Sequence, residues 1–222
     1  MTFRLNYFLF RLRRVGAHFS RRRQQLRAVW WQAKGGLGAV EVLFALLDLL
    51  GVFDAYAAVS NTLTPSVRGL TEEEKYLLRP IFGDSVPWDL VRIDERAWVG
   101  PRWANICYVS FYTINSWGPM AFHVLVHEMV HIWQYTRVGA AYIPRALAAQ
   151  RSAMGYNYGG LAALERGKDM DAFNYEQQAD IIEDAYRLAN GYQAQWHGFG
   201  PEVLPVYFPY LREIRDVEVA EE

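Results

Sequence analysis

The strongest constraint on this sequence is residues 124–134, an apolar run in which His127 and Glu128 are followed three positions later by His131. Neither Gly nor Pro interrupts this run, so we expect it to be helical. Residues four apart lie on the same face of a helix, and both imidazoles can therefore be directed at one metal ion. Glu128 lies beside them, where its carboxylate can reach a water molecule at that ion. The pattern indicates a site of the zinc hydrolase type.

An ordinary helix with two histidines in packing positions is the alternative interpretation of this motif. Val126, Met129 and Val130 make the run apolar enough to be buried. Imidazole and carboxylate groups buried in such a helix need polar partners, and a metal ion supplies them. The local context therefore favours a metal site.

Two histidines do not complete a catalytic zinc site, which usually has three protein ligands. His123 lies on the same expected helix, but it is about 12 Å from His131 along the axis at 1.5 Å per residue. A Zn–N bond is about 2 Å long, so His123 and His131 cannot bind the same ion. His18 and His197 stay open as alternative ligands.

A second expected helix, residues 173–189, offers a carboxylate ligand. Glu176 is the candidate third ligand. Asp180, one turn later on the same face, is the candidate acceptor for the remaining ring N–H of one motif histidine. Glu183 and Asp184 are alternatives one turn further. The same residues could instead form a solvated acidic helix face.

The overall composition limits the class of protein. The chain has 222 residues, enough for one domain with appendages, and 52% of them are hydrophobic. Its net charge of −1 makes nucleic acid an unlikely partner. The one cysteine, Cys107, excludes an internal disulfide and a cysteine metal cluster, and we expect it to be an inert core residue.

The N-terminal quarter differs from the rest of the chain. Residues 1–34 are basic and aromatic, and no acidic residue precedes Glu41. Such an arm either docks its aromatic side chains on the protein body or contacts an anionic membrane surface or nucleic acid.

Residues 37–60 form the most apolar segment, close to the length that spans a bilayer. Glu41, Asp48 and Asp54 would each cost a few kcal/mol near a bilayer centre. We therefore expect one buried or surface-docked amphipathic helix. The alternatives are a true membrane span, with the protein membrane-associated through residues 37–60, and a partner-shielded delivery segment.

The remaining patterns predict an α+β fold that is mainly helical with a small β-sheet. A capping box at Thr71–Glu74 begins a helix that Pro80 stops after Leu78. Residues 105–114 have the strongest strand composition. The other expected elements are a strand over 88–94, a helix over 142–152 and a loop over 155–160. We divide the chain into an arm with an apolar helix (1–68), a metal-binding domain (69–192) and an irregular C-terminal tail containing three prolines (193–222).

The sequence also resembles a known family. His127-Glu128-x-x-His131 followed by Asn174-x-Glu176-x-x-x-Asp180 is similar to the gluzincin metallopeptidases. Residues 80–85, 91–93, 133–134 and 175–180 further resemble the metallopeptidase-like domain of bacterial contractile injection system and Vgr-related (type VI secretion) proteins. The resemblance extends from Gly69 to Leu188. It implies a zincin-like domain with one zinc ion per chain held by His127, His131 and Glu176. We expect a helical N-terminal arm, residues 1–68, to precede this domain; the resemblance does not cover it.

The activity implied is that of a zinc metalloendopeptidase. Glu128 would be the general base toward a metal-activated water, and Tyr156 or Tyr158 would stabilise the oxyanion. By analogy with other zinc peptidases, an extended substrate would lie along the strand at 105–114.

Two other functions stay open. The chain could be a catalytically inactive, metal-stapled structural or delivery module of a secretion apparatus, or residues 1–60 could carry its main role as a membrane- or chaperone-binding arm. The partners implied are a peptide or protein substrate and a secretion-machine, chaperone or immunity protein. The sequence leaves open whether the protein acts in the bacterial cytoplasm or is secreted or delivered.

Overall fold

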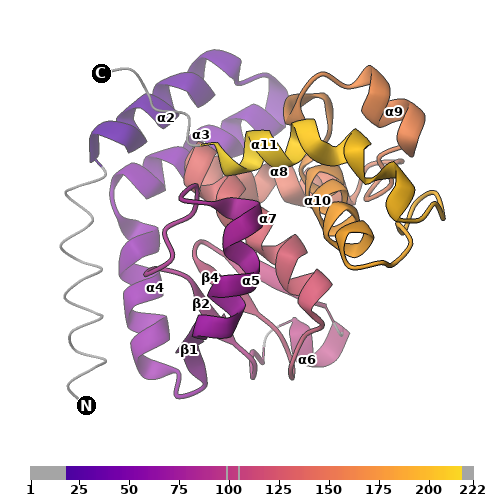
Figure 1. Cartoon of the computed structure of the whole chain (residues 1–222). Coiled ribbons are helices and arrows are strands. Elements are labelled where there is room, and N and C mark those ends of the chain that lie inside the picture. Colours follow the sequence, from indigo (N-terminus) through magenta and orange to yellow (C-terminus); the bar gives the residue numbers. More distant parts are fainter. Residues whose placement is uncertain (1–18, 99, 105, 217–222) are drawn as a thin grey trace.

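A computed structural model describes residues 19–98, 100–104 and 106–216 of the chain. Most of these residues are helical, and four short strands form one sheet, so the predicted α+β, mainly helical class is confirmed (Figure 1). The α-helices are α2 (Phe19–Gln32), α3 (Gly35–Leu49), α4 (Val52–Leu63), α5 (Glu72–Phe82), α6 (Pro101–Ala104), α7 (Phe122–Val138), α8 (Tyr142–Gln150), α9 (Leu161–Arg166), α10 (Tyr175–Ala189) and α11 (Phe208–Arg215). The strands are β1 (Val67–Gly69), β2 (Arg92–Asp94), β3 (Tyr108–Ser110) and β4 (Thr113–Asn115), and the 3₁₀ helices are η1 (Gly139–Ala141), η2 (Met170–Ala172) and η3 (Pro201–Tyr207).

The sheet has the order β1-β2-β4-β3. Strands β2 and β4 are parallel, with Ile93 opposite Ile114, and the two outer pairs are antiparallel. Ile93 and Ile114 are fully buried in the main hydrophobic core. The sheet therefore has one face against the helices, as its short apolar strands require.

Helices α7 and α10 pack against each other in the centre of the molecule. Val126, Met129 and Val130 of α7 and Ile181 and Ile182 of α10 have no exposed surface and belong to one core. Because α7 and α10 are packed together, the motif on α7 can lie close to a carboxylate on α10.

The apolar segment 37–60 is two helices rather than one. Helix α3 ends before Gly51, whose φ of +72° is in the left-handed region, and α4 continues at an angle of 67°. Neither helix alone is long and apolar enough to cross a membrane, although the bent pair passes a test of length and composition. The prediction of a single helix is wrong because glycine at this position permits a sharp turn.

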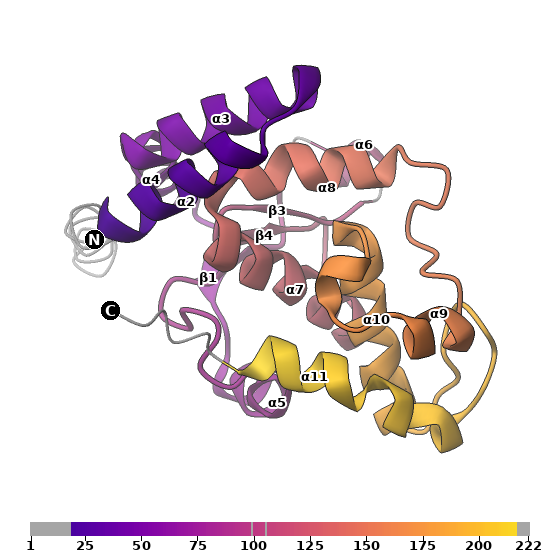
Figure 2. The same ribbon diagram turned by 90° about the horizontal axis from the view of Figure 1, so that it is seen from above.

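Helices α2, α3 and α4 form a layer at one side of the molecule, away from α9 and α11 (Figures 1 and 2). Buried Arg22 of α2 pairs with Asp54 and approaches Asp48 to 3.7 Å. Asp48 also accepts hydrogen bonds from the Tyr135 hydroxyl (3.2 Å) and the Ala140 N–H (3.2 Å). The layer is therefore joined to the C-terminal end of α7 by buried charged and polar contacts.

The capping box at Thr71 is confirmed, but the predicted stop at Pro80 is wrong. Helix α5 continues through Pro80 to Phe82. The buried side chains of Leu78 and Phe82 lie on either side of the proline and hold the last turn in place. Tertiary packing thus offsets the lost backbone hydrogen bond, which costs about 3 kcal/mol in an unsupported helix.

The predicted strand at 105–114 is instead a hairpin, in which β3 and β4 are joined by Phe111 and Tyr112. Asn105 lies outside the described residues. Phe111 has a φ of +61°, which is unusual for a bulky side chain. Its ring stacks on Phe53 (4.6 Å between centroids) and contacts Tyr135, so tertiary packing holds the turn.

The predicted irregular tail is also corrected. Residues 201–215 form η3 and α11, and Tyr207, Tyr210 and Ile214 are buried. Prolines lie in the first turns of both helices, where no N–H is needed. The domain division at residues 68 and 192 stays a prediction, and residues 1–18 of the arm lie outside the described part.

Candidate metal centre

Helix α7 carries His127, Glu128 and His131, all of them buried. Glu176 lies in the first turn of α10 and is 1% exposed. The start of α10 is fixed by a capping box in which Asn174 accepts from the N–H groups of residues 176 and 177. This cap sets the position of the Glu176 side chain opposite the motif.

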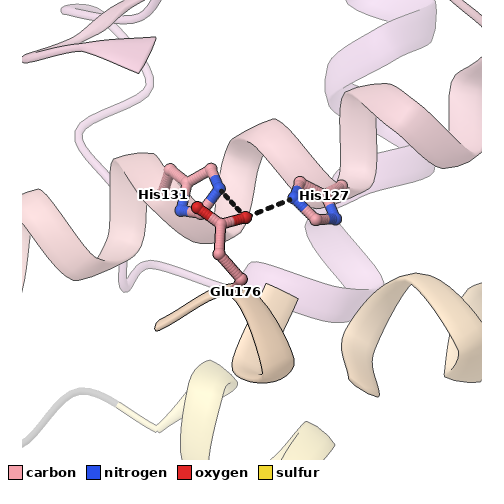
Figure 3. A group of neighbouring side chains, drawn as sticks. All are labelled: His127, His131 and Glu176. Atoms are coloured by element: carbon pink, nitrogen blue, oxygen red, sulfur yellow. Dashed lines mark ion pairs between the residues drawn. The ribbon is translucent and has the colours of Figure 1, made fainter. Parts of the chain in front are cut away.

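Three side-chain atoms converge between the two helices (Figure 3). Glu176 Oε2 lies 3.5 Å from His127 Nε2 and 3.5 Å from His131 Nε2. The three ligand atoms lie within 4.8 Å of one another, a spacing that can accommodate a metal ion.

The other polar atom of each of these side chains already has a partner. His127 Nδ1 is 2.9 Å from Asp180 Oδ1, and His131 Nδ1 is 2.8 Å from Gln134 Oε1. Glu176 Oε1 accepts from Gln150 Nε2 at 2.9 Å. These contacts orient the rings and the carboxylate so that the two Nε2 atoms and Oε2 point inward.

Two buried carboxylate oxygens among the described residues have no hydrogen-bond partner, Glu176 Oε2 and Glu128 Oε2. An unsatisfied buried acceptor costs roughly 1–3 kcal/mol, and more when it is charged. Both oxygens belong to the motif or to its facing helix. The donor set and its unsatisfied atoms therefore fit a bound cation.

The electrostatics of the cluster follow from burial and close contacts. Burial raises the pKa of Glu176, but the His127 and His131 imidazoles 3.5 Å from its Oε2 outweigh burial and hold that pKa far below its usual range. Burial also raises the pKa of Glu128, and the nearby imidazoles only partly oppose it. Glu128 is consequently a stronger base than an exposed glutamate.

A second group of possible metal ligands uses the opposite side of His127. It comprises His127, Asp180 and Glu183, and Glu183 Oε2 lies 3.2 Å from His127 Nδ1. Glu183 Oε1 also contacts His123 Nδ1 at 2.8 Å. Asp180 and Glu183 both contact His127 Nδ1. Their main role is therefore to hold the His127 imidazole in its orientation.

A cleft of about 660 Å³ opens onto the motif. Glu128, His127 and Tyr156 line it, and so do His123 and Cys107. The Tyr156 ring lies 6.1 Å from the His127 ring, and burial followed by the Glu176 charge raises the pKa of Tyr156 to about 12. Cys107 is half-buried in the cleft wall rather than in the core, and burial raises its pKa to about 11.

The chain is similar to a secretion-system spike protein. This relative is the type VI secretion system spike protein VgrG2b of Pseudomonas aeruginosa, 28% identical over 171 residues. The similarity covers 70% of this chain but 16% of the relative, so the chain spans only a small part of the relative's length. No protein-family model and no solved structure matches the chain.

Tyr158 is engaged away from the converging atoms. Its buried hydroxyl donates to Asp184 Oδ2 (2.6 Å) and lies 2.6 Å from the Tyr207 hydroxyl. The Tyr207 hydroxyl in turn contacts His197 Nε2 at 2.7 Å. Of the two tyrosines expected to stabilise an oxyanion, the structure thus places only Tyr156 in the cleft wall.

The Asp184 carboxyl is expected to make stability depend on pH. Burial raises its pKa from 3.8 to about 6, against hydrogen bonds from Tyr158 and the Gln195 N–H. Between these values the folded state holds a proton that the unfolded state has lost, so stability falls as the pH rises from about 4 to about 6. The loss is about 3 kcal/mol for this side chain, which is 1% exposed.

Chemical denaturation of an Asp184→Asn variant between about pH 4 and pH 7 tests this effect. As the pH rises, the free energy of unfolding of the variant should increase relative to that of the wild type by about 2–3 kcal/mol, because the variant has no carboxyl to ionise. Asp84→Asn, at an exposed position, is the matched control and should follow the wild type. Parallel curves for Asp184→Asn and the wild type would contradict the expectation.

Several supporting residues were not predicted from the sequence. Gln134 is fixed by Tyr175 O and Gln178 Oε1, and it presents its oxygen to His131. Gln150 and Trp196 hold Glu176 and Asp180 respectively. Glutamine and tryptophan carry no metal-ligand signal in a sequence, so only their spatial position reveals them.

Proposed function

We propose that this chain is a zinc-dependent peptidase domain that cleaves peptide bonds in a cleft formed between α7, α10 and the loops beside the sheet. His127, His131 and Glu176 would hold one zinc ion. The observation that carries the proposal is the convergence of their three free ligand atoms, each fixed from behind by another side chain. Two imidazoles and one carboxylate form a donor set typical of catalytic zinc.

When bound, zinc supplies a Lewis acid that polarises a peptide carbonyl and makes water more acidic. Glu128 would accept a proton from the attacking water through Oε2, the buried oxygen that has no hydrogen-bond partner. It could then pass that proton to the leaving amine nitrogen. Tyr156, a neutral phenol in the cleft wall, can donate a hydrogen bond to the carbonyl oxygen as negative charge develops there. The low exposure of His127, Glu128 and Glu176 strengthens the electrostatic part of these interactions.

We further propose that the chain acts with a secretion apparatus. The support is its similarity to the type VI spike protein. Under this proposal the substrate is a peptide or protein, and the chain is secreted or delivered with that machinery.

Metal content and cleavage should be measured on the same purified protein. We expect about one zinc per chain by mass spectrometry, and cleavage of an unfolded protein such as reduced casein that a chelator stops and added zinc restores. Zinc at that ratio without cleavage would favour the alternative, a metal-stapled module of the secretion apparatus. Absence of bound metal after zinc is supplied would overturn both functions.

A further inference from the structure

The outer face of α3 and α4 is an exposed apolar surface. Nine large hydrophobic side chains on it are between 41% and 74% exposed, namely Leu37, Val40, Leu43, Leu46, Leu50, Val52, Tyr56, Val59 and Leu63. The four of these residues that belong to α4 are spaced four, three and four positions apart, which places those four in one stripe along the helix. Extended apolar surfaces of this kind in a soluble fold mark a site of interaction.

The same surface carries no charge. Every residue from 35 to 65 is described, and the three acidic side chains among them, Glu41, Asp48 and Asp54, are all buried. Glu41 pairs with Arg145 at 2.9 Å, and Asp48 and Asp54 face Arg22. In the sequence, these three acids argue against a location near the bilayer centre. In the structure they are turned inward, so the outer face of α3 and α4 carries no charged side chain.

Cations and tryptophans flank this surface on α2. Trp30 and Trp31 are 62% and 81% exposed. Arg23 and Arg27 of α2 and Lys34, the N-cap residue of α3, are also exposed, and α2 contains no acidic residue. Tryptophan favours the boundary between lipid and water, and cations are attracted to anionic headgroups.

We propose that α2, α3 and α4 bind the surface of an anionic lipid bilayer, with the leucines and valines in the acyl boundary and the α2 cations at the headgroups. A protein partner or a second copy of this chain would cover the apolar face without needing the adjoining cations. Lipid explains both features, because interfacial helices combine an apolar face with basic residues.

The helices should lie on the bilayer rather than cross it. Crossing would separate Glu41 from Arg145 and both Asp48 and Asp54 from Arg22. It would place these acids in hydrocarbon without their partners, at a cost of several kcal/mol. Surface binding uses the exposed face and leaves every one of these contacts intact.

Vesicle flotation of the full chain tests the proposal without any reference to metal or cleavage. The probes are vesicles of phosphatidylcholine alone and vesicles with phosphatidylglycerol at about a 7:3 ratio. We expect binding to the anionic vesicles, and a fall of about tenfold or more in partitioning for Leu50→Glu and for Leu63→Glu. Both side chains are more than 70% exposed, so these changes spare the core.

Tyr76→Glu is the matched control, because Tyr76 is 77% exposed on α5, outside this surface. It should float with the vesicles like the wild type. Equal flotation of the leucine variants and the wild type would overturn the proposal, and so would failure of the wild type to bind either vesicle. Concentration-dependent dimers in ultracentrifugation that Leu63→Glu dissolves, without vesicle binding, would assign the surface to a second copy of the chain instead.

Discussion

Glu128→Gln is expected to lower kcat/KM for peptide cleavage by about 10²–10⁴-fold while leaving zinc bound. Glutamine has nearly the same shape as glutamate but cannot accept a proton at the position of Oε2. Glu128 makes none of the contacts that orient the three converging atoms, so the metal site should persist. Removing a buried charge should also leave the fold intact, because burial already disfavours the ionised Glu128 carboxylate.

The measurement is steady-state cleavage of one fluorogenic peptide, with zinc content determined on the same samples. Glu73→Gln, at an exposed position on α5, is a control for handling and should retain wild-type activity. Cleavage that survives in Glu128→Gln at the wild-type rate would exclude Glu128 as the base. Loss of zinc together with activity would instead give Glu128 a role in the metal site.

Glu176→Ala is expected to lower zinc affinity by at least about 100-fold, with His131→Ala behaving similarly. Each change removes one of the three converging ligand atoms. The wild type should also gain thermal stability when zinc is added, because zinc binds the folded state. The Glu176→Ala variant should lose this gain.

Glu183→Gln provides a matched control for the ligand assignment. Glu183 lies on the same helix as Glu176 and is also buried, but it contacts the opposite nitrogen of His127. Zinc stoichiometry by mass spectrometry and titration with a competing chelator should show a much smaller loss of affinity for Glu183→Gln than for Glu176→Ala, because Asp180 still accepts from His127 Nδ1. The reverse result, with zinc lost in Glu183→Gln and kept in Glu176→Ala, would move the ion to the group formed by His127, Asp180 and Glu183.

The parts of the fold predicted correctly are those governed by local chemistry. The capping box at Thr71, the helix that carries the motif and the helix that begins after Asn174 follow from residues within one or two turns of each other. Helical spacing also places Glu176 and Asp180 on one face, so the sequence predicts that Asp180 accepts a ring N–H from His127 or His131. The structure places Asp180 at His127.

The errors arise where distant residues outweigh local preference. Phe111 turns the chain between β3 and β4 because Phe53 and Tyr135 hold its ring, although no glycine or asparagine marks a turn there. Pro80 lies within α5 because the core holds the turn that follows it. Pro201 and Pro209 lie in the first turns of η3 and α11, and Pro205 lies within η3, because buried side chains of these helices belong to the main core.

The candidate ligand side chains can be read from local sequence: two histidines and a glutamate at helical spacing on one helix, and a carboxylate pair at the same spacing on another. Their roles can be read locally because a helix fixes which side chains share a face. Which atoms meet depends on the folded arrangement, since Gln134, Gln150 and Asp180 select the nitrogen or oxygen that each neighbour presents. The same arrangement also directs the acids of α3 and α4 inward, because buried Arg22 and Arg145 come from elements distant in the chain.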